Sequence, residues 1–171
     1  MSRIQRHVKN EEKIKMNRKD PHEKIIQINC AVCDAPVMVD QWKQGSCQNC
    51  GWYQTEYQPE YPDRVIVPNM VTLNRARQLF KEGKPFKPTF EEFLMAWEDW
   101  GELEFHHRSR RYGLISARDD TIHFYEWKVK GSVQIFETIQ EFRDKAHIGG
   151  ILLKDLWRDI CSQQDKVKES F

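Results

Sequence analysis

Two pairs of cysteines carry the clearest chemical signal in the sequence. Cys30 and Cys33 form one Cys-x-x-Cys pair, Cys47 and Cys50 form a second, and residues 34–46 separate the two. Each pair directs two thiolates toward one point, so the two pairs together can surround Zn(II) with Zn–S distances of about 2.3 Å. Because four cysteines leave no open coordination position, the spacing predicts one structural Zn(II) per chain.

The cysteines admit two further interpretations. Thioredoxin-like redox chemistry uses one Cys-x-x-Cys beside a βαβ unit, whereas this sequence has two pairs and no such unit. An iron site uses the same four thiolates, and the spacing does not exclude iron.

His22 would replace a cysteine only by breaking the paired spacing, so we expect it to be an exposed histidine. Cys161 follows an apolar helical pattern and is expected to be buried as a small apolar side chain.

A second group of candidate side chains is basic or titratable. The segment His106-His107-Arg108-Ser109-Arg110-Arg111 could bind phosphate or an acidic partner, or it could be a solvated hairpin turn. His123 alternates with apolar neighbours and is expected to be a sheet residue. No Ser-His-Asp order, P-loop, GxGxxG or HExxH motif occurs. The sequence predicts a protein that is not an enzyme, with a hydrolase or nuclease using His106 and His107 as the enzymatic alternative.

The chain that positions these groups has 171 residues, and this length is enough for one main core and one small module. The 27 Lys and Arg residues nearly balance the 26 Asp and Glu residues, so the net charge of +1 gives no general attraction to nucleic acid or anionic membranes. No apolar stretch approaches the ~20 residues of a transmembrane helix. The charged N-terminus lacks an apolar signal segment, which predicts a cytoplasmic protein without disulfides.

Prolines, glycines and charges divide the chain into units. Strand-like segments at 25–29, 36–40 and 51–57, around the cysteine pairs, predict a zinc ribbon. The proline-rich segment 58–70 cannot form the interior of a helix. A short amphipathic helix should follow, with Thr72 as its N-cap and Gly83 just beyond its end. The predicted units are a basic N-terminal arm (1–24), the zinc ribbon plus short helix (25–83), a linker (84–88), an α+β module (89–162) and a polar C-terminal tail (163–171).

The α+β module should combine an antiparallel sheet with three helices. A capping box, which opens a helix, occurs at Thr89–Glu92 and again at Thr138–Glu141, and Gly149-Gly150 precedes a final helix. Strand-like segments between the first two helices are predicted at 102–106, 112–117, 122–129 and 133–136. The predicted fold class is α+β, with an N-terminal four-cysteine zinc ribbon followed by a small antiparallel sheet covered by helices.

Residues 30–81 resemble the bacterial cysteine-rich CPCC-type zinc-binding proteins. The resemblance rests on two cysteine pairs, an aromatic residue after the second pair and a PN-x-x-x-LN-x-A-R helix start. Beyond the cysteines these positions are Trp52, Pro68, Asn69, Leu73, Asn74, Ala76 and Arg77. The resemblance implies zinc binding and no established enzyme activity. Ala31-Val32 stand where that family has Pro and Cys, which leaves four cysteines rather than five in the module. Residues 89–160 look like a small bacterial domain of uncharacterised proteins.

The leading hypothesis is a non-catalytic protein-binding module, immunity-like or regulatory, of a bacterium or phage. The acids of the helix after Thr89 are expected to face away from the core and to bind a protein partner. The candidate partner surface consists of Glu91, Glu98, Asp99 and Trp52, with Glu92 among the outward-facing acids. No membrane partner is expected, and the oligomeric state stays open.

The alternative hypothesis is a nucleic-acid-binding zinc-ribbon accessory protein. Basic side chains would contact phosphates, and exposed aromatic side chains of the ribbon would stack on bases. The candidate phosphate or anion contacts are Arg75, Arg77, Lys81, Lys84, Arg108, Arg110 and Arg111, and the candidate stacking residues are Trp42, Trp52 and Tyr53.

Overall fold

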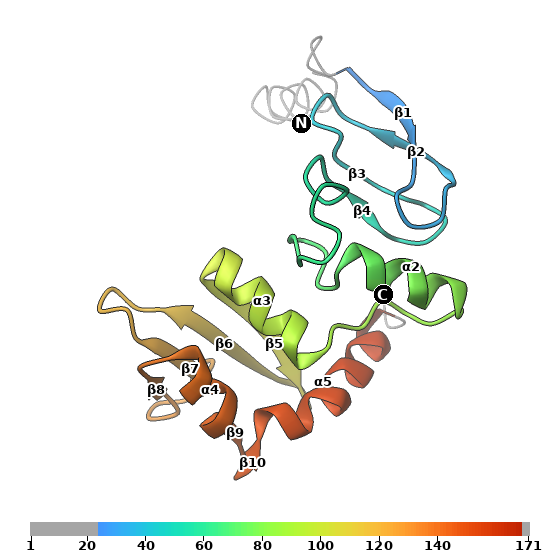
Figure 1. Ribbon diagram of the computed structural model, residues 1–171. Helices are drawn as coiled ribbons and strands as arrows, with labels where there is room; N and C mark the ends of the chain where they lie inside the picture. The colour runs from blue at the N-terminus through green and yellow to red at the C-terminus, as the bar shows by residue number, and fades with distance from the viewer. Residues whose placement is uncertain (1–23, 169–171) are drawn as a thin grey trace, which may run out of the picture.

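The computed structural model describes residues 24–168, with side chains up to Cys161. An N-terminal ribbon of short strands is followed by a four-stranded sheet with helices (Figure 1), which confirms the predicted α+β fold. The predicted basic arm, apart from Lys24, and His22 lie outside the described residues. Among the helices described, none is both long and apolar enough to cross a bilayer.

The ribbon consists of two antiparallel hairpins, each next to one cysteine pair. Strands β1 (Ile26–Asn29) and β2 (Pro36–Val39) form the first hairpin, and β3 (Gly45–Ser46) and β4 (Tyr53–Gln54) form the second. The sequence pattern missed β3, which has only two residues. A Cβ at Gly45 would lie 2.5 Å from the Met38 carbonyl oxygen, so only glycine allows β3 to approach β2 this closely.

Helix α2 (Leu73–Lys81) packs against the ribbon and has the predicted ends. The Thr72 side chain accepts a hydrogen bond from the Arg75 amide, and Gly83 has the positive φ of +64° that follows many helices. Leu73 and Ala76 are buried with Trp52 and Val71 in the core of the ribbon. The connector before α2 contains no helix, as its prolines predict.

The C-terminal module is built on one antiparallel sheet of order β5-β6-β7-β8. A tight turn joins the first two strands, and its residues Arg108 and Ser109 have positive φ. The hairpin turn is therefore shorter than residues 106–111, since the flanking residues belong to strands. The strands are β5 (Glu102–His107), β6 (Arg110–Ser116), β7 (Ile122–Glu126) and β8 (Gln134–Phe136).

Three helices cover one face of this sheet (Figure 1). They are α3 (Phe90–Trp100), α4 (Ile139–Lys145) and α5 (Leu153–Lys168). Their apolar side chains meet the inward residues of the strands in a core rich in aromatic rings, where Trp157 lies 4.3 Å from Phe93 and 5.5 Å from Phe105 between ring centroids. Helix α5 continues to Lys168, into the residues assigned to a polar tail.

The two capping boxes differ in the structure. At α3 the box is complete, because Thr89 and Glu92 exchange side-chain and backbone hydrogen bonds. At α4 the Thr138 side chain accepts from the Glu141 amide, but the Glu141 carboxylate accepts from the amide of Glu137, one residue before the N-cap. Gly149-Gly150 forms the turn of a short hairpin, β9 (His147–Ile148) with β10 (Ile151–Leu152), that the sequence pattern did not predict.

Glu92 of α3 connects the ribbon to the sheet module. Its side chain is buried, accepts hydrogen bonds from the backbone amides of Thr72 at 3.0 Å and Thr89 at 2.9 Å, and forms an ion pair with Arg75. The prediction that Glu92 faces solvent with the other acids of α3 is therefore wrong. The helical pattern could not show that the start of α2 approaches this side of α3.

The residues between α2 and α3 are also packed. Phe86 meets Trp52 edge-on with ring centroids 5.9 Å apart. The Pro88 carbonyl accepts hydrogen bonds from Trp157 Nε1 at 3.0 Å and Cys161 Sγ at 3.5 Å. Residues 84–88 belong to no helix or strand, yet they contact both modules.

Candidate metal centre and partner surfaces

The two hairpins of the ribbon bring the four predicted ligand residues together. The Sγ atoms of Cys30, Cys33, Cys47 and Cys50 all lie within 4.8 Å of one another. Cys30 Sγ lies 3.6 Å from Cys50 Sγ, and Cys33 Sγ lies 3.6 Å from Cys47 Sγ. Four sulfurs around Zn(II) at 2.3 Å would be separated by about 3.8 Å, so the cluster has the size that a tetrahedral thiolate site needs.

The cysteines are unpaired thiols, which is the form that metal coordination requires. Cys30 and Cys47 are buried, and Cys33 and Cys50 are partly buried. The donor set therefore fits a bound metal of the zinc or iron class.

Backbone and side-chain donors surround the sulfurs. The Val32 amide donates to Cys30 Sγ at 3.4 Å, and Gln54 Nε2 donates to the same sulfur at 3.1 Å. Gln54 Oε1 in turn accepts from the Ala31 amide, and Arg77 Nε donates to the Ala31 carbonyl at 2.8 Å. Gln54 and Arg77 thus hold the first cysteine turn in place. Gln54 lies two residues after the buried Trp52, and side chains two residues apart in an extended segment point to the same side, so this spacing was a signal for the inward position of Gln54.

The thiols do not ionise alike. Burial raises the pKa of Cys30, and burial together with the neighbouring thiols raises the pKa of Cys50. Burial also acts to raise the pKa of Cys33, but hydrogen bonds from the Asn49 side chain, the Ala35 amide and neighbouring thiols outweigh it and lower the pKa to about 7. A metal ion must therefore displace protons from Cys30 and Cys50, so we expect affinity to fall as pH falls.

Gln54→Leu tests the role of the buried amide beside the sulfurs. The substitution keeps most of the side-chain volume but removes the donor to Cys30 Sγ and the acceptor for the Ala31 amide. We expect metal affinity to fall about tenfold, as it does for other residues that support metal ligands. A competition titration with a chromogenic chelator measures the affinity. Gln48→Leu is the control, because Gln48 is exposed and donates only to the Ser46 carbonyl. Equal affinities of the two variants would contradict this role.

Most of the predicted phosphate contacts are engaged within the molecule. Arg75 and Arg77 stabilise the packing of α2, as described above. Among the other candidates, Lys81 is exposed and forms no ion pair with the described residues, and Arg108 lies at the exposed β5–β6 turn. The ion pairs of the rest are Lys84 with Glu82, Arg110 with Glu126 and Arg111 with Glu104.

The ribbon aromatics predicted to stack on bases have different environments. Trp52 is only 1% exposed, so the prediction that it belongs to a partner or stacking surface is wrong. It packs under the second cysteine pair against α2 and Phe86, and in the described residues its indole Nε1 has no hydrogen-bond acceptor. Tyr53 is partly buried, and Trp42 is 62% exposed.

The acidic candidates of α3 lie at the surface. Glu91 pairs with Arg143 across to α4, whereas Glu98 and Asp99 form no ion pair with any described residue. Met95 is 43% exposed and Trp100 is 60% exposed on the same helix. Met95, Glu98 and Asp99 line a hollow of about 260 Å³ together with residues 63–65 of the connector. We call the exposed residues Met95, Glu98, Asp99 and Trp100 the α3 surface.

The histidines do not form a common site. His106 is exposed and His107 is buried, because adjacent strand residues point to opposite faces of the sheet. Burial and the neighbouring Arg108 lower the pKa of His107. His123 Nε2 lies 3.0 Å from the Thr121 hydroxyl, within the sheet as predicted. Cys161 is buried among apolar side chains of the core, which confirms the prediction for this residue.

Residues 28–91 match the protein family described as cysteine-rich CPCC. The match contains the whole four-cysteine cluster, α2 and the first residues of α3, and it covers less than half of the chain. Comparison with curated proteins and with solved structures gave no match. The family match agrees with the resemblance found in the sequence and with a metal-binding module at the N-terminal end of the described chain.

Proposed function

We propose that this chain is a non-catalytic protein-binding module held together by one structural Zn(II). The thiolate cluster supports the metal part of the proposal, because its four sulfurs fill a tetrahedron and leave no position for substrate. Zinc is the commoner occupant of such closed Cys₄ sites. In this function the metal stabilises the ribbon and takes no part in chemistry.

The α3 surface is the observation that carries the binding part of the proposal. It combines two exposed apolar side chains, Met95 and Trp100, with two carboxylates that no described cation neutralises, Glu98 and Asp99. Exposed aromatic and Met side chains are enriched in protein interfaces, and free carboxylates beside them favour a basic partner. We therefore assign the partner surface to this part of α3.

The nucleic-acid alternative has less support from the same side chains. At least five of its seven candidate cations already have an acceptor within the molecule, a backbone carbonyl for Arg77 and a carboxylate for the others. A polyanion would have to compete with these acceptors. A role as an immunity-like or regulatory factor of a bacterium or phage is part of our proposal and rests on the sequence resemblance. The cytoplasmic location that we propose rests on the charged N-terminal sequence.

The double variant Glu98→Lys/Asp99→Lys tests the proposed partner surface. Tagged full-length protein should capture a stoichiometric partner from lysate of its own host, and the charge reversal should abolish capture, because two attractive contacts become repulsive. Glu56→Lys/Glu60→Lys is the matched control, since it makes the same change in net charge at two exposed positions between β4 and α2. Equal capture by both variants, or bound nucleic acid released steeply by salt, would contradict the proposal.

A further inference from the structure

The sheet of the C-terminal module has its longer edge at β5. In the order β5-β6-β7-β8, only β5 and β8 can pair with another strand. Strand β8 has only three residues, and its Gln134 side chain is bound to the backbone of His147, donating to the carbonyl at 2.7 Å and accepting from the amide at 3.1 Å. Strand β5 has six residues, and no described strand pairs with its outer side.

The pairing pattern shows which backbone amides and carbonyls of β5 do not bond to β6. The Ser116 amide donates to the Gly101 carbonyl, and the Arg111 carbonyl accepts from the Trp127 amide. In an antiparallel ladder these two bonds fix the alternation, so Leu103, Phe105 and His107 bond to β6. The backbone amides and carbonyls of Glu102, Glu104 and His106 therefore point away from the sheet. None of these three amides donates to a backbone group elsewhere in the described chain.

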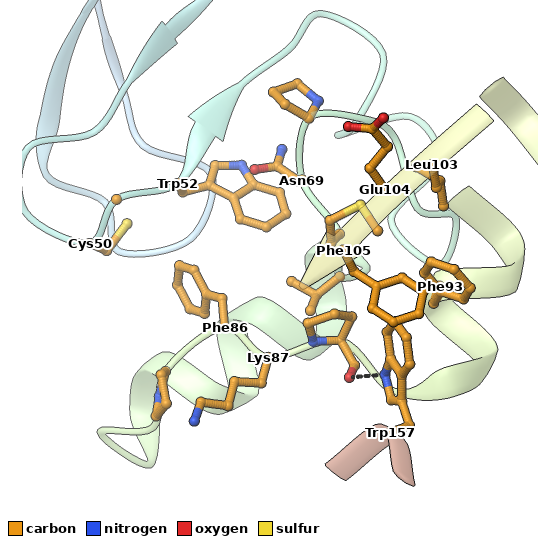
Figure 2. A pocket seen from close by; sticks show the side chains of 16 residues that line it. Cys50, Trp52, Asn69, Phe86, Lys87, Phe93, Leu103, Glu104, Phe105 and Trp157 are labelled. Atoms are coloured by element: carbon orange, nitrogen blue, oxygen red, sulfur yellow. Dashed lines mark hydrogen bonds between the residues drawn. The ribbon is translucent and has the colours of Figure 1, made fainter. Parts of the chain in front are cut away.

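A cavity of about 570 Å³ borders this edge. Leu103, Glu104 and Phe105 of β5 form one wall, and Cys50 and Trp52 of the ribbon lie opposite (Figure 2). The other lining residues are mostly apolar or proline and belong to 68–71, 85–88 and the core residues Phe93 and Trp157. The volume is within the range of ligand sites.

The side chains along β5 indicate which side chains an added segment needs. On the outer face, Glu102 and Glu104 lie two residues apart, and only Glu104 has a cation, Arg111. A strand beside β5 would place every second side chain next to these carboxylates and the others toward the apolar cavity. Opposite charges on adjacent strands stabilise the pairing. The fitting chemistry is an extended segment in which basic and apolar residues alternate.

We propose that the cavity between the ribbon and the sheet module binds an extended peptide segment of a protein partner, with alternating basic and apolar residues, as an additional antiparallel strand on β5. Main-chain hydrogen bonds to Glu102, Glu104 and His106 give affinity, and the cavity selects apolar side chains at alternate positions. The proposal rests on the proposed function only in that the partner is a protein. It uses a different surface from Met95, Glu98, Asp99 and Trp100, so the two tests fail independently.

Fluorescence polarisation with a labelled hexapeptide of sequence Ser-Lys-Val-Lys-Val-Ser tests the edge with metal-loaded, full-length protein. An antiparallel strand turns the lysine amides toward β5 and the valine amides away from it. Methylation of the two lysine amide nitrogens should weaken binding at least about tenfold, whereas methylation of the two valine amides should leave affinity within about twofold. A peptide with Ser in place of Val should also bind weakly. Equal affinity of the two methylated peptides, or no binding of the parent peptide, overturns the proposal.

A pair of variants at one position tests the protein side. Glu104→Pro removes an amide that points away from β6, and proline is tolerated on edge strands. Glu104→Ala removes the same side-chain contacts with Arg111 and Trp127 but keeps the amide. We expect peptide affinity of the proline variant to be about tenfold below that of the alanine variant. Circular dichroism verifies that both variants are folded, and equal peptide affinities of two folded variants would refute strand addition. If the proline variant does not fold, the comparison of the methylated peptides tests strand addition instead.

Discussion

Cys47→Ser is expected to abolish metal binding and to unfold the ribbon while the sheet module stays folded. Cys47 is 1% exposed and supplies one of four sulfurs to the cluster. The ribbon has only eight buried core residues among those described, and two of them are cysteines of the cluster, so we expect its folding to depend on a bound metal. Structural Zn(II) contributes about 10–16 kcal/mol in small zinc modules, far more than a single hydroxyl can replace. The sheet module has its own core of 17 buried residues.

Elemental analysis and hydrogen exchange measure this outcome. Metal content should fall from one ion per chain to none, and the amides of β1 to β4 should exchange rapidly while those of β5 to β8 stay protected. Cys161→Ala is the matched control, because it removes a buried cysteine outside the cluster. Full metal content in Cys47→Ser, with a protected ribbon, would show that the cluster does not hold the ribbon together.

Glu92→Ala should destabilise the protein by about 3 kcal/mol. The substitution breaks a buried ion pair with Arg75, removes half of the capping box of α3, and leaves the Thr72 amide without its acceptor. The Arg75 side chain is 32% exposed and can regain some hydration, which places the effect at the lower end of the range for broken buried pairs. Urea denaturation followed by fluorescence gives the free energy of unfolding.

Glu91→Ala is the comparison for this experiment. Glu91 is the neighbouring acid on the same helix and pairs with Arg143, but its side chain is 50% exposed. Exposed pairs of this kind contribute less than about 1 kcal/mol. A similar loss of stability in both variants would mean that the buried position of Glu92 has no special role in joining the modules.

The features that the sequence predicts well depend on neighbours along the chain. Thr72 and Thr89 cap their helices because a cap needs only the next three residues. The cysteine pairs are predictable for the same reason, because each Cys-x-x-Cys turn is formed by neighbouring residues and both turns have the same spacing. The order of strands in the sheet follows from short hairpin connections between alternating segments.

The features that the sequence misplaces depend on partners far along the chain. Arg77 contacts a carbonyl 46 residues away, and Arg75 contacts a carboxylate 17 residues away, so both resembled free cations. Trp52 resembled a surface aromatic, since the helix and Phe86 that cover it come later in the chain. Charge and hydropathy describe what a side chain can do, whereas its partner is set by tertiary packing.

The three-residue length of β8 also limits how far copies of this protein can assemble. A sheet with two long free edges permits open-ended polymerisation, because each added copy offers a new edge to the next. Here β5 has six residues but β8 has three, and a very short edge strand is a poor partner for a further strand. Pairing of β5 in one copy with β8 in the next is therefore disfavoured, which protects the protein from fibre growth at high concentration.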